Sequence, residues 1–146
     1  MKKKNNWEED LKKGEEIEYK LLEYLQKKYP KAYKMEGNFK DFDIEVPEKD
    51  IKIEVKRDIG SQESGNFFIE YECNYKPSGI STSKANYWVI YDEGSYTWVK
   101  ISVLKSICLI YGNTWKGFPN GGLSTVGGYL IPKHTLKEHD ARKQEE

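Results

Sequence analysis

The sequence predicts a single domain of the α/β (α+β) class, in which a mixed central β-sheet is flanked by helices. Three observations lead to this prediction: a long amphipathic stretch opens the chain, several strand-length apolar runs follow it, and a shorter helical pattern comes after them. The chain has 146 residues, which is the length of one domain. We expect residues 1–146 to form one domain, with fraying in the first few residues and in a charged tail over about 137–146.

A helix is predicted over Trp7–Tyr29, where apolar residues recur every three or four positions and Pro30 ends the pattern. Gly14 lies inside this stretch and costs up to about 1 kcal/mol relative to alanine. We therefore expect that the helix restarts at Gly14 or that another group packs closely against it.

A β-hairpin is predicted next, because the hydrophobic period changes from three or four residues to two. Its strands are Phe39–Val46 and Ile51–Arg57, joined by a turn at Pro47–Asp50. On each strand the apolar residues share one face, and the charged residues share the other.

The remaining elements follow from apolar runs and turn residues. They are a polar, mobile loop over Gly60–Gly65, a strand over Asn66–Cys73, one or two helical turns over Ser81–Asn86, a buried central strand over Tyr87–Tyr91, a strand over Thr97–Ile101, a helix over Val103–Ile110 capped by Ser102, a loop over Tyr111–Gly122 and a last apolar stretch over Tyr129–Pro132.

The composition indicates a folded intracellular protein. Aromatic residues make up 14% of the chain, which is too many for a disordered one. The 24 basic and 24 acidic residues cancel, which excludes a histone-like binder but is compatible with a local nucleic-acid-binding patch. The two cysteines, Cys73 and Cys108, form no CxxC pair, which argues against a cysteine-type zinc site and indicates a reducing compartment.

The hydropathy predicts a cytoplasmic location. The N-terminal residues lack the apolar stretch of a signal peptide. No run approaches the length of about 18 apolar residues that a membrane-spanning helix needs. We expect no membrane partner.

The hairpin concentrates the side chains that can carry chemistry. Glu54 and Lys56 share one face of their strand, and Asp43 can lie opposite them at about 5 Å. Two carboxylates this close repel each other unless a cation lies between them, and Mg²⁺ (or Mn²⁺) takes oxygen ligands of this kind. The carbonyl of Val55 could add another oxygen. A lysine beside such a metal suits phosphodiester hydrolysis, because it stabilises negative charge or holds the attacking water.

Asp43 followed by Glu54-Val55-Lys56 resembles the PD-(D/E)xK nuclease superfamily, which implies a restriction-endonuclease-like fold with an αβββαβ core. The stretch from Gly14 to Glu18 is similar to the G-x-x-x-E segment of archaeal-type Holliday junction resolvases and many phage nucleases. Residues 66–70 and 78–85 resemble segments of small phage-type members, so a viral or phage origin is compatible with the sequence. The resemblance covers roughly residues 10 to 105.

The resemblance implies a Mg²⁺- or Mn²⁺-dependent deoxyribonuclease. The implied metal ligands are Asp43, Glu54 and the Val55 carbonyl, with Glu18 in support, and Lys56 is the implied activator of water. An endonuclease is expected, either general or structure-selective and resolvase-like. A resolvase works as a symmetric dimer, and Trp98 or Trp115 are candidates for such a homodimer face.

Alternatives are open at two of these positions. Asp41 competes with Asp43, and Glu15 and Glu16 compete with Glu18. The pair Glu54 and Lys56 also has a structural interpretation, as a solvated ion pair worth about 0–1 kcal/mol.

Two further functions share the fold or the site. One is a catalytically inactive module that binds nucleic acid, and the other is an RNA endonuclease. DNA is favoured over RNA because the resembled families mostly cut DNA.

Weaker candidates for nucleic-acid contacts lie outside the hairpin. Ser81, Thr82 and Lys84 lie near the expected short helix, whose N-terminus could hold a phosphate. Asn66 and Glu70 lie on the third strand, where Glu70 is either a second-metal or substrate contact or an edge-strand charge.

Aromatic and basic residues give a further set of candidates. The loop with Trp115, Lys116 and Phe118 either stacks on bases or anchors itself to the body of the domain. Lysines cluster at the N-terminus and at the end of the first helix, where they could contact phosphates: Lys2, Lys3, Lys4, Lys12, Lys13, Lys27, Lys28, Lys31 and Lys34.

Overall fold

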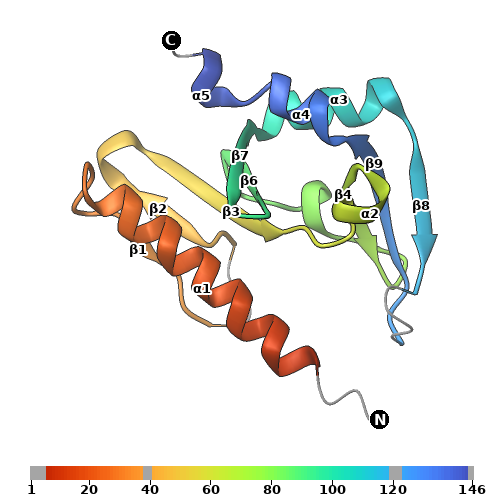
Figure 1. Cartoon of the computed structure of the whole chain (residues 1–146), viewed down its shortest axis with the longest axis horizontal. Coiled ribbons are helices and arrows are strands. Elements are labelled where there is room, and N and C mark those ends of the chain that lie inside the picture. Colours follow the sequence, from red (N-terminus) through yellow and green to blue (C-terminus); the bar gives the residue numbers. More distant parts are fainter. Residues whose placement is uncertain (1–5, 38–40, 119–122, 145–146) are drawn as a thin grey trace.

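The computed structural model describes residues 6–37, 41–118 and 123–144, which form two β-sheets with helices around them (Figure 1). The first sheet has the strand order β1-β2-β3-β6-β7. Its neighbours are antiparallel except β3 and β6, which are parallel, so the expected mixed sheet is present. Its strands are β1 (Tyr33–Lys34), β2 (Ile44–Val46), β3 (Ile51–Arg57), β6 (Tyr87–Asp92) and β7 (Ser95–Lys100).

The second sheet is antiparallel and has the order β5-β4-β9-β8. Its strands are β5 (Lys76–Pro77), β4 (Asn66–Cys73), β9 (Val126–Pro132) and β8 (Thr114–Gly117). The sequence predicted a single sheet, and this prediction is wrong for β4. Alternation places the side chains of a strand on two faces, but it does not select the strand with which it pairs.

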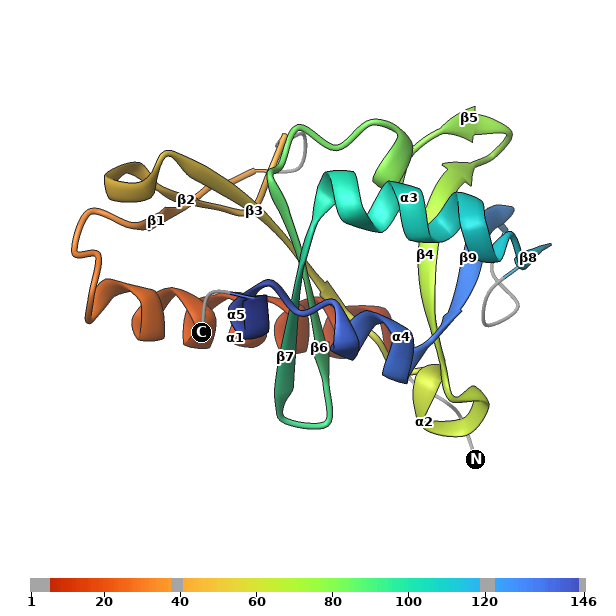
Figure 2. The same cartoon turned by 90° about the horizontal axis from the view of Figure 1, so that it is seen from above.

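The helices close the two cores. α1 (Asn6–Gln26) packs along one face of the first sheet, as both views show (Figures 1 and 2). α3 (Ile101–Tyr111) and α4 (Lys133–Glu138) contact β7 of the first sheet and β9 of the second, so they bridge the sheets (Figure 2). The short helices are α2 (Ser61–Ser64) and α5 (Ala141–Gln144), and 3₁₀ turns cover Pro47–Lys49 and Gly79–Ser81.

Alternation along β6 divides the interior into two cores. Val89 joins the core under α1, whereas Trp88 and Ile90 join the core formed with the second sheet and α3. The same alternation along β3 turns Ile53 and Val55 toward α1. Lys52, Glu54 and Lys56 of β3 therefore lie on the face turned toward the second sheet, whereas Arg57 pairs with Asp10 of α1.

Several local expectations need correction. The first helix ends at Gln26 and runs unbroken through Gly14, where an added Cβ would meet nothing within 4 Å. The loop at 60–65 contains α2, and the expected helix at 81–86 is replaced by the 3₁₀ turn at Gly79–Ser81.

The second half of the chain also differs from the elements expected from the sequence. The loop expected over 111–122 contains β8, and α3 begins at Ile101 after Lys100, so Ser102 is not its cap. The tail expected to fray over about 137–146 contains the end of α4 and all of α5, and Asp140 between them is buried.

No helix among the described residues is long and apolar enough to cross a membrane.

Candidate active site

Asp43 is fixed at the end of the β2–β3 hairpin. The register pairs Ile44 with Ile53, and Asp43 directly precedes this first pair of the hairpin. The backbone N–H of Val55 donates to Oδ2 of Asp43 at 2.7 Å, and the Asp43 N–H donates to the Ile53 carbonyl at 2.9 Å. Asp43 is only 3% exposed. These bonds hold a buried carboxyl group beside the Glu54-Val55 peptide.

Glu54 and Lys56 lie on the face of β3 that points away from α1. The ammonium of Lys56 is 3.7 Å from Oε2 of Glu54 and 5.4 Å from the centre of the Trp88 ring. The side chain of Lys56 is 45% exposed, and that of Glu54 is 18% exposed. The ammonium of Lys56 is therefore positioned by Glu54 and the indole while its side chain stays partly open to solvent.

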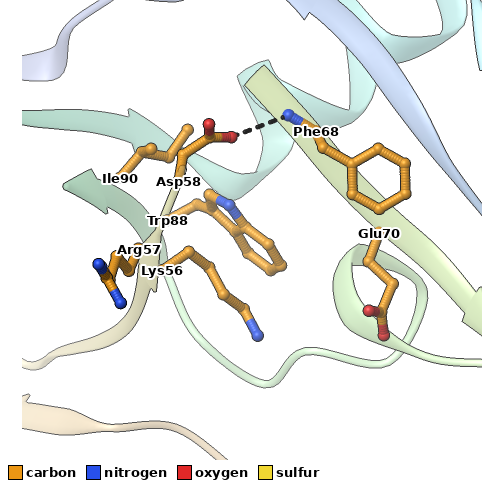
Figure 3. Close-up of a pocket in the computed structure, with 7 residues that line it drawn as sticks. All are labelled: Lys56, Arg57, Asp58, Phe68, Glu70, Trp88 and Ile90. Atoms are coloured by element: carbon orange, nitrogen blue, oxygen red, sulfur yellow. Dashed lines mark hydrogen bonds between the residues drawn. The ribbon is translucent and has the colours of Figure 1, made fainter. Parts of the chain in front are cut away.

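A pocket of about 180 Å³ opens beside Lys56. Residues of β3, β4 and β6 and the residue after β3 line it: Lys56, Arg57, Asp58, Phe68, Glu70, Trp88 and Ile90. The close-up shows the ends of Lys56 and Glu70 extending past the Trp88 ring at the same end of the pocket (Figure 3). The pocket thus brings a lysine of the first sheet and a carboxylate of the second to one opening.

Glu70 is held in place by the segment that follows β5. Its Oε2 accepts a hydrogen bond of 2.7 Å from the hydroxyl of Ser78. Gly79 has φ +53, and an added Cβ there would lie 2.2 Å from the backbone carbonyl oxygen of Glu70. The close approach explains why a glycine occupies this position.

Asp58, which lines the pocket and joins the two sheets, was missed by the sequence reasoning. Its Oδ1 accepts from the Ser61 N–H at 2.8 Å, and its Oδ2 accepts from the Phe68 N–H at 3.1 Å (Figure 3). The Asp58 N–H donates to the Tyr91 carbonyl at 2.9 Å. An aspartate three residues before a serine at the start of a short helix is a local signal for such a turn.

Glu18 lies on the α1 side of the first sheet. Its carboxylate is 3.6 Å from the ammonium of Lys34, and both side chains are largely buried. Glu54 and Lys56 project from the opposite face of that sheet. Supporting ligation by Glu18 therefore stays a prediction.

The competing acids are placed differently from Asp43 and Glu18. Asp41, Glu15 and Glu16 are exposed, whereas Asp43 is buried in the hairpin. Burial beside Glu54 favours Asp43 over Asp41.

The weaker nucleic-acid candidates do not form one site. The hydroxyl of Ser81 donates to the Tyr71 carbonyl at 2.8 Å, and Thr82 and Lys84 are exposed. Because no α-helix begins at 81, the expected phosphate site at a helix N-terminus is absent there. The N–H of Asn66 donates to the Ser64 hydroxyl at 3.1 Å, a local contact at the start of β4.

The aromatic candidates separate into a core residue and a surface residue. Trp98 is 9% exposed and belongs to the core under α1, so it is not available as a dimer face. Trp115 is 42% exposed and packs edge-on against Phe68 at 5.9 Å between ring centres. This contact favours the interpretation of Trp115 as an anchor of β8.

The expected lysine clusters are reduced by burial. Lys12 and Lys13 are exposed, as are Lys27, Lys28 and Lys31. The ammonium of Lys34 instead pairs with Glu18 and Glu36, at 3.6 and 3.9 Å. Lys2, Lys3 and Lys4 lie outside the described residues.

The hairpin offers oxygen donors that suit a hard divalent cation. Within residues 6–37, 41–118 and 123–144, no group of three or more His, Cys, Asp or Glu side chains could hold a metal. Magnesium, however, is commonly held by one or two carboxylates with waters and substrate phosphate completing the shell. The Val55 N–H points toward Asp43, and the carbonyl of a strand residue faces the same neighbouring strand as its N–H. Asp43, Glu54 and the Val55 carbonyl therefore fit Mg²⁺ in kind and number.

Comparison of the chain with protein-family models, with curated proteins and with solved structures finds no match.

Proposed function

We propose that this chain is a divalent-metal-dependent deoxyribonuclease of the PD-(D/E)xK type, an endonuclease that hydrolyses phosphodiester bonds. The observation that carries the proposal is the buried Asp43, tied by its carboxylate to the Val55 N–H at 2.7 Å, beside Glu54 and Lys56. The closeness of Asp43 to the Glu54-Val55 peptide of β3 supports the proposal.

The roles follow from the chemistry of each group. Asp43, Glu54 and the Val55 carbonyl would hold Mg²⁺ or Mn²⁺, which when bound neutralises phosphate charge and lowers the pKa of water. Lys56 donates a hydrogen bond to the phosphate or to the attacking water and stabilises the negative charge that develops. The exposed fraction of the Lys56 side chain, 45%, leaves it accessible to a bound strand.

The order of the elements also supports the proposal. α1 is followed by the antiparallel strands β1, β2 and β3, and then by β6, which is parallel to β3. This order is similar to the first part of an αβββαβ core. The restriction-endonuclease-like fold is part of the proposal, because the connection from β3 to β6 here carries β4 and β5 of the second sheet.

The proposal extends to the substrate and the setting. DNA is the preferred partner, with a resolvase-like homodimer as the structure-selective form. Cys73 and Cys108 are both free thiols, which suits a cytoplasmic location. The second candidate is an inactive nucleic-acid-binding module. The third candidate, an RNA endonuclease, needs the same metal site as the proposed deoxyribonuclease and differs from it only in its contacts to the 2′-OH.

A turnover assay separates these candidates. End-labelled single strand, duplex, flap, four-way junction and RNA are incubated in excess over the protein with MgCl₂, MnCl₂ or EDTA, and Glu54→Ala and Lys56→Ala are run in parallel. We expect metal-dependent cutting that both substitutions abolish, and the preferred substrate then defines the subtype. DNA that is retarded in EDTA but never cut would instead support the binding module.

A further inference from the structure

A second and larger pocket, of about 510 Å³, opens on the face of the first sheet that α1 covers. Tyr87 and Trp98 line it, and both pack in or against the core under α1. Trp88, the neighbour of Tyr87 along β6, lines the pocket beside Lys56 instead. The two pockets therefore lie on opposite faces of the sheet.

Positive charge surrounds this second pocket. Lys27, Lys28, Lys49 and Arg142 line it, whereas none of the described residues in its lining is acidic. The charge of Arg142 is compensated by Asp140, because the guanidinium of Arg142 lies 2.9 Å from Oδ2 of Asp140. The three lysines are exposed, and in the part of the chain that the structure describes none of them forms an ion pair with a carboxylate. The charge of the three lysines is thus available to an anionic ligand.

Aromatic rings form the other part of the lining. Tyr24 lines the pocket and is 65% exposed. The ammonium of Lys28 lies 5.5 Å from the ring centre of Tyr29. Tyr87 and Trp98 meet edge to face at 5.9 Å between ring centres. The exposed ring of Tyr24 and the partly buried ring of Tyr29, next to ammonium groups, suit a planar ring that carries an anionic group.

We propose that this pocket binds a nucleotide, with its base against the tyrosines and its phosphate among Lys27, Lys28 and Lys49. The volume falls in the range of about 300–1,000 Å³ that is usual for small-ligand sites. A phosphate monoester carries about −1.5 to −2 charges near neutral pH, which matches the uncompensated lysines. Aromatic side chains bind bases by stacking, which tolerates any base because every base has a π-face. The inference does not depend on the proposed nuclease activity, because the pocket shares no residue with the site around Asp43.

Calorimetric titration with 5′-AMP in EDTA tests the proposal. Adenosine and inorganic phosphate, the two halves of AMP, are titrated separately for comparison. We expect AMP to bind at least about tenfold more tightly than either half, because ring and phosphate contacts add. Lys28→Ala combined with Lys49→Ala is expected to weaken AMP binding by about tenfold or more, with little change in the melting temperature because both lysines are exposed. Lys12→Ala with Lys13→Ala, two exposed lysines in the N-terminal half of α1 that do not line the pocket, is the matched control.

The source of the nucleotide is decided by a parallel titration with a tetranucleotide that does or does not carry a 5′-phosphate. Tighter binding of the phosphorylated tetranucleotide than of AMP supports the end of a strand as the ligand, and the reverse supports a free nucleotide. The inference would be overturned if neither AMP nor the phosphorylated tetranucleotide binds. It would also be overturned if AMP and adenosine bind with equal affinity, or if the double lysine substitution leaves the AMP affinity unchanged. Glu54→Ala is expected to keep the AMP affinity, so failure here and failure of the proposed nuclease are distinguishable.

Discussion

The Val55 N–H donates to the carboxylate of Asp43 across the β2–β3 hairpin at 2.7 Å. The bond takes the place of a ladder hydrogen bond at the point where β2 begins, because Asp43 precedes the first paired residue, Ile44. Asp43 therefore has a structural task, satisfying a buried N–H, in addition to the metal ligation that we propose.

Substitutions at Asp43 are expected to separate these two tasks. Asn retains an oxygen acceptor for the Val55 N–H, whereas Ala leaves this N–H without one and costs about 1–3 kcal/mol. We predict that Asp43→Ala unfolds at lower urea than Asp43→Asn and that neither cuts DNA. MgCl₂ should raise the melting temperature of the wild type but not of Asp43→Asn, because only a bound ion stabilises the folded state. A Mg²⁺ effect of equal size in both proteins would place the metal elsewhere.

Lys56→Met is expected to reduce cleavage without reducing stability. The lysine is 45% exposed, and its ion pair with Glu54 at 3.7 Å is worth at most about 1 kcal/mol. Loss of its positive charge from the reaction should lower kcat by about 100-fold or more. Lys52→Met is the matched control, because Lys52 lies on the same face of the same strand. Similar losses from both substitutions would point to general electrostatic attraction of DNA rather than to a catalytic role for Lys56.

Gly79→Ala is expected to destabilise the protein and to disturb Glu70. The new Cβ would lie 2.2 Å from the Glu70 carbonyl oxygen, and the φ of +53 is also unfavourable for alanine. The strained backbone alone costs about 1–3 kcal/mol, and the clash adds to it. Gly94→Ala has a positive φ of +83 but nothing within 4 Å, so it isolates the backbone contribution. Urea unfolding should rank Gly79→Ala as less stable than Gly94→Ala, and the opposite order would refute the close approach.

Asp140 is expected to make stability depend on acid pH. Burial alone would raise its pKa, but hydrogen bonds and charge from Arg142 and a hydrogen bond from the Trp98 N–H hold it below 3.8. A carboxyl group with a depressed folded-state pKa stabilises the protein above its unfolded pKa, and this stability is lost as the pH falls through the folded value.

The comparison of Asp140→Asn with the wild type checks this sign. We predict that the variant is less stable at pH 7 and that the difference in unfolding free energy shrinks below about pH 4. Urea unfolding of both proteins at pH 7 and below about pH 4 measures this difference in unfolding free energy. A difference that stays constant with pH would show that Asp140 acts only through its shape.

Strong periodicity explains which elements were predictable. The apolar stripe of α1 and the alternation along β3 each bury a continuous face, so their residues specify helix and strand locally. β8 has no such signal, because Thr114–Gly117 pairs on one side with β9 and three of its four residues are exposed. The separation into two sheets is a matter of strand partners, which no local pattern contains.

The candidate site was partly predictable for the same reason. Period-two alternation put Glu54 and Lys56 on one face, and the predicted hairpin brought Asp43 next to β3, where it contacts the Val55 N–H. The position of Glu70 across the pocket from Lys56 was not predictable, because it depends on the second sheet packing beside the first. Asp58 was missed because its partners, Ser61 and Phe68, belong to the connection into that sheet.

The most direct test of the proposed metal site is the rate at which wild type and Glu54→Gln cut a four-way junction and a duplex in MgCl₂, with EDTA as the blank. The substitution keeps the size of the side chain and removes only its charge. We predict that the wild type cuts DNA and that EDTA stops this cutting. Glu54→Gln should lower the cleavage rate by at least about 100-fold, while both proteins unfold at similar urea concentrations. Equal cutting by both proteins, or cutting that persists in EDTA, would contradict the proposed site.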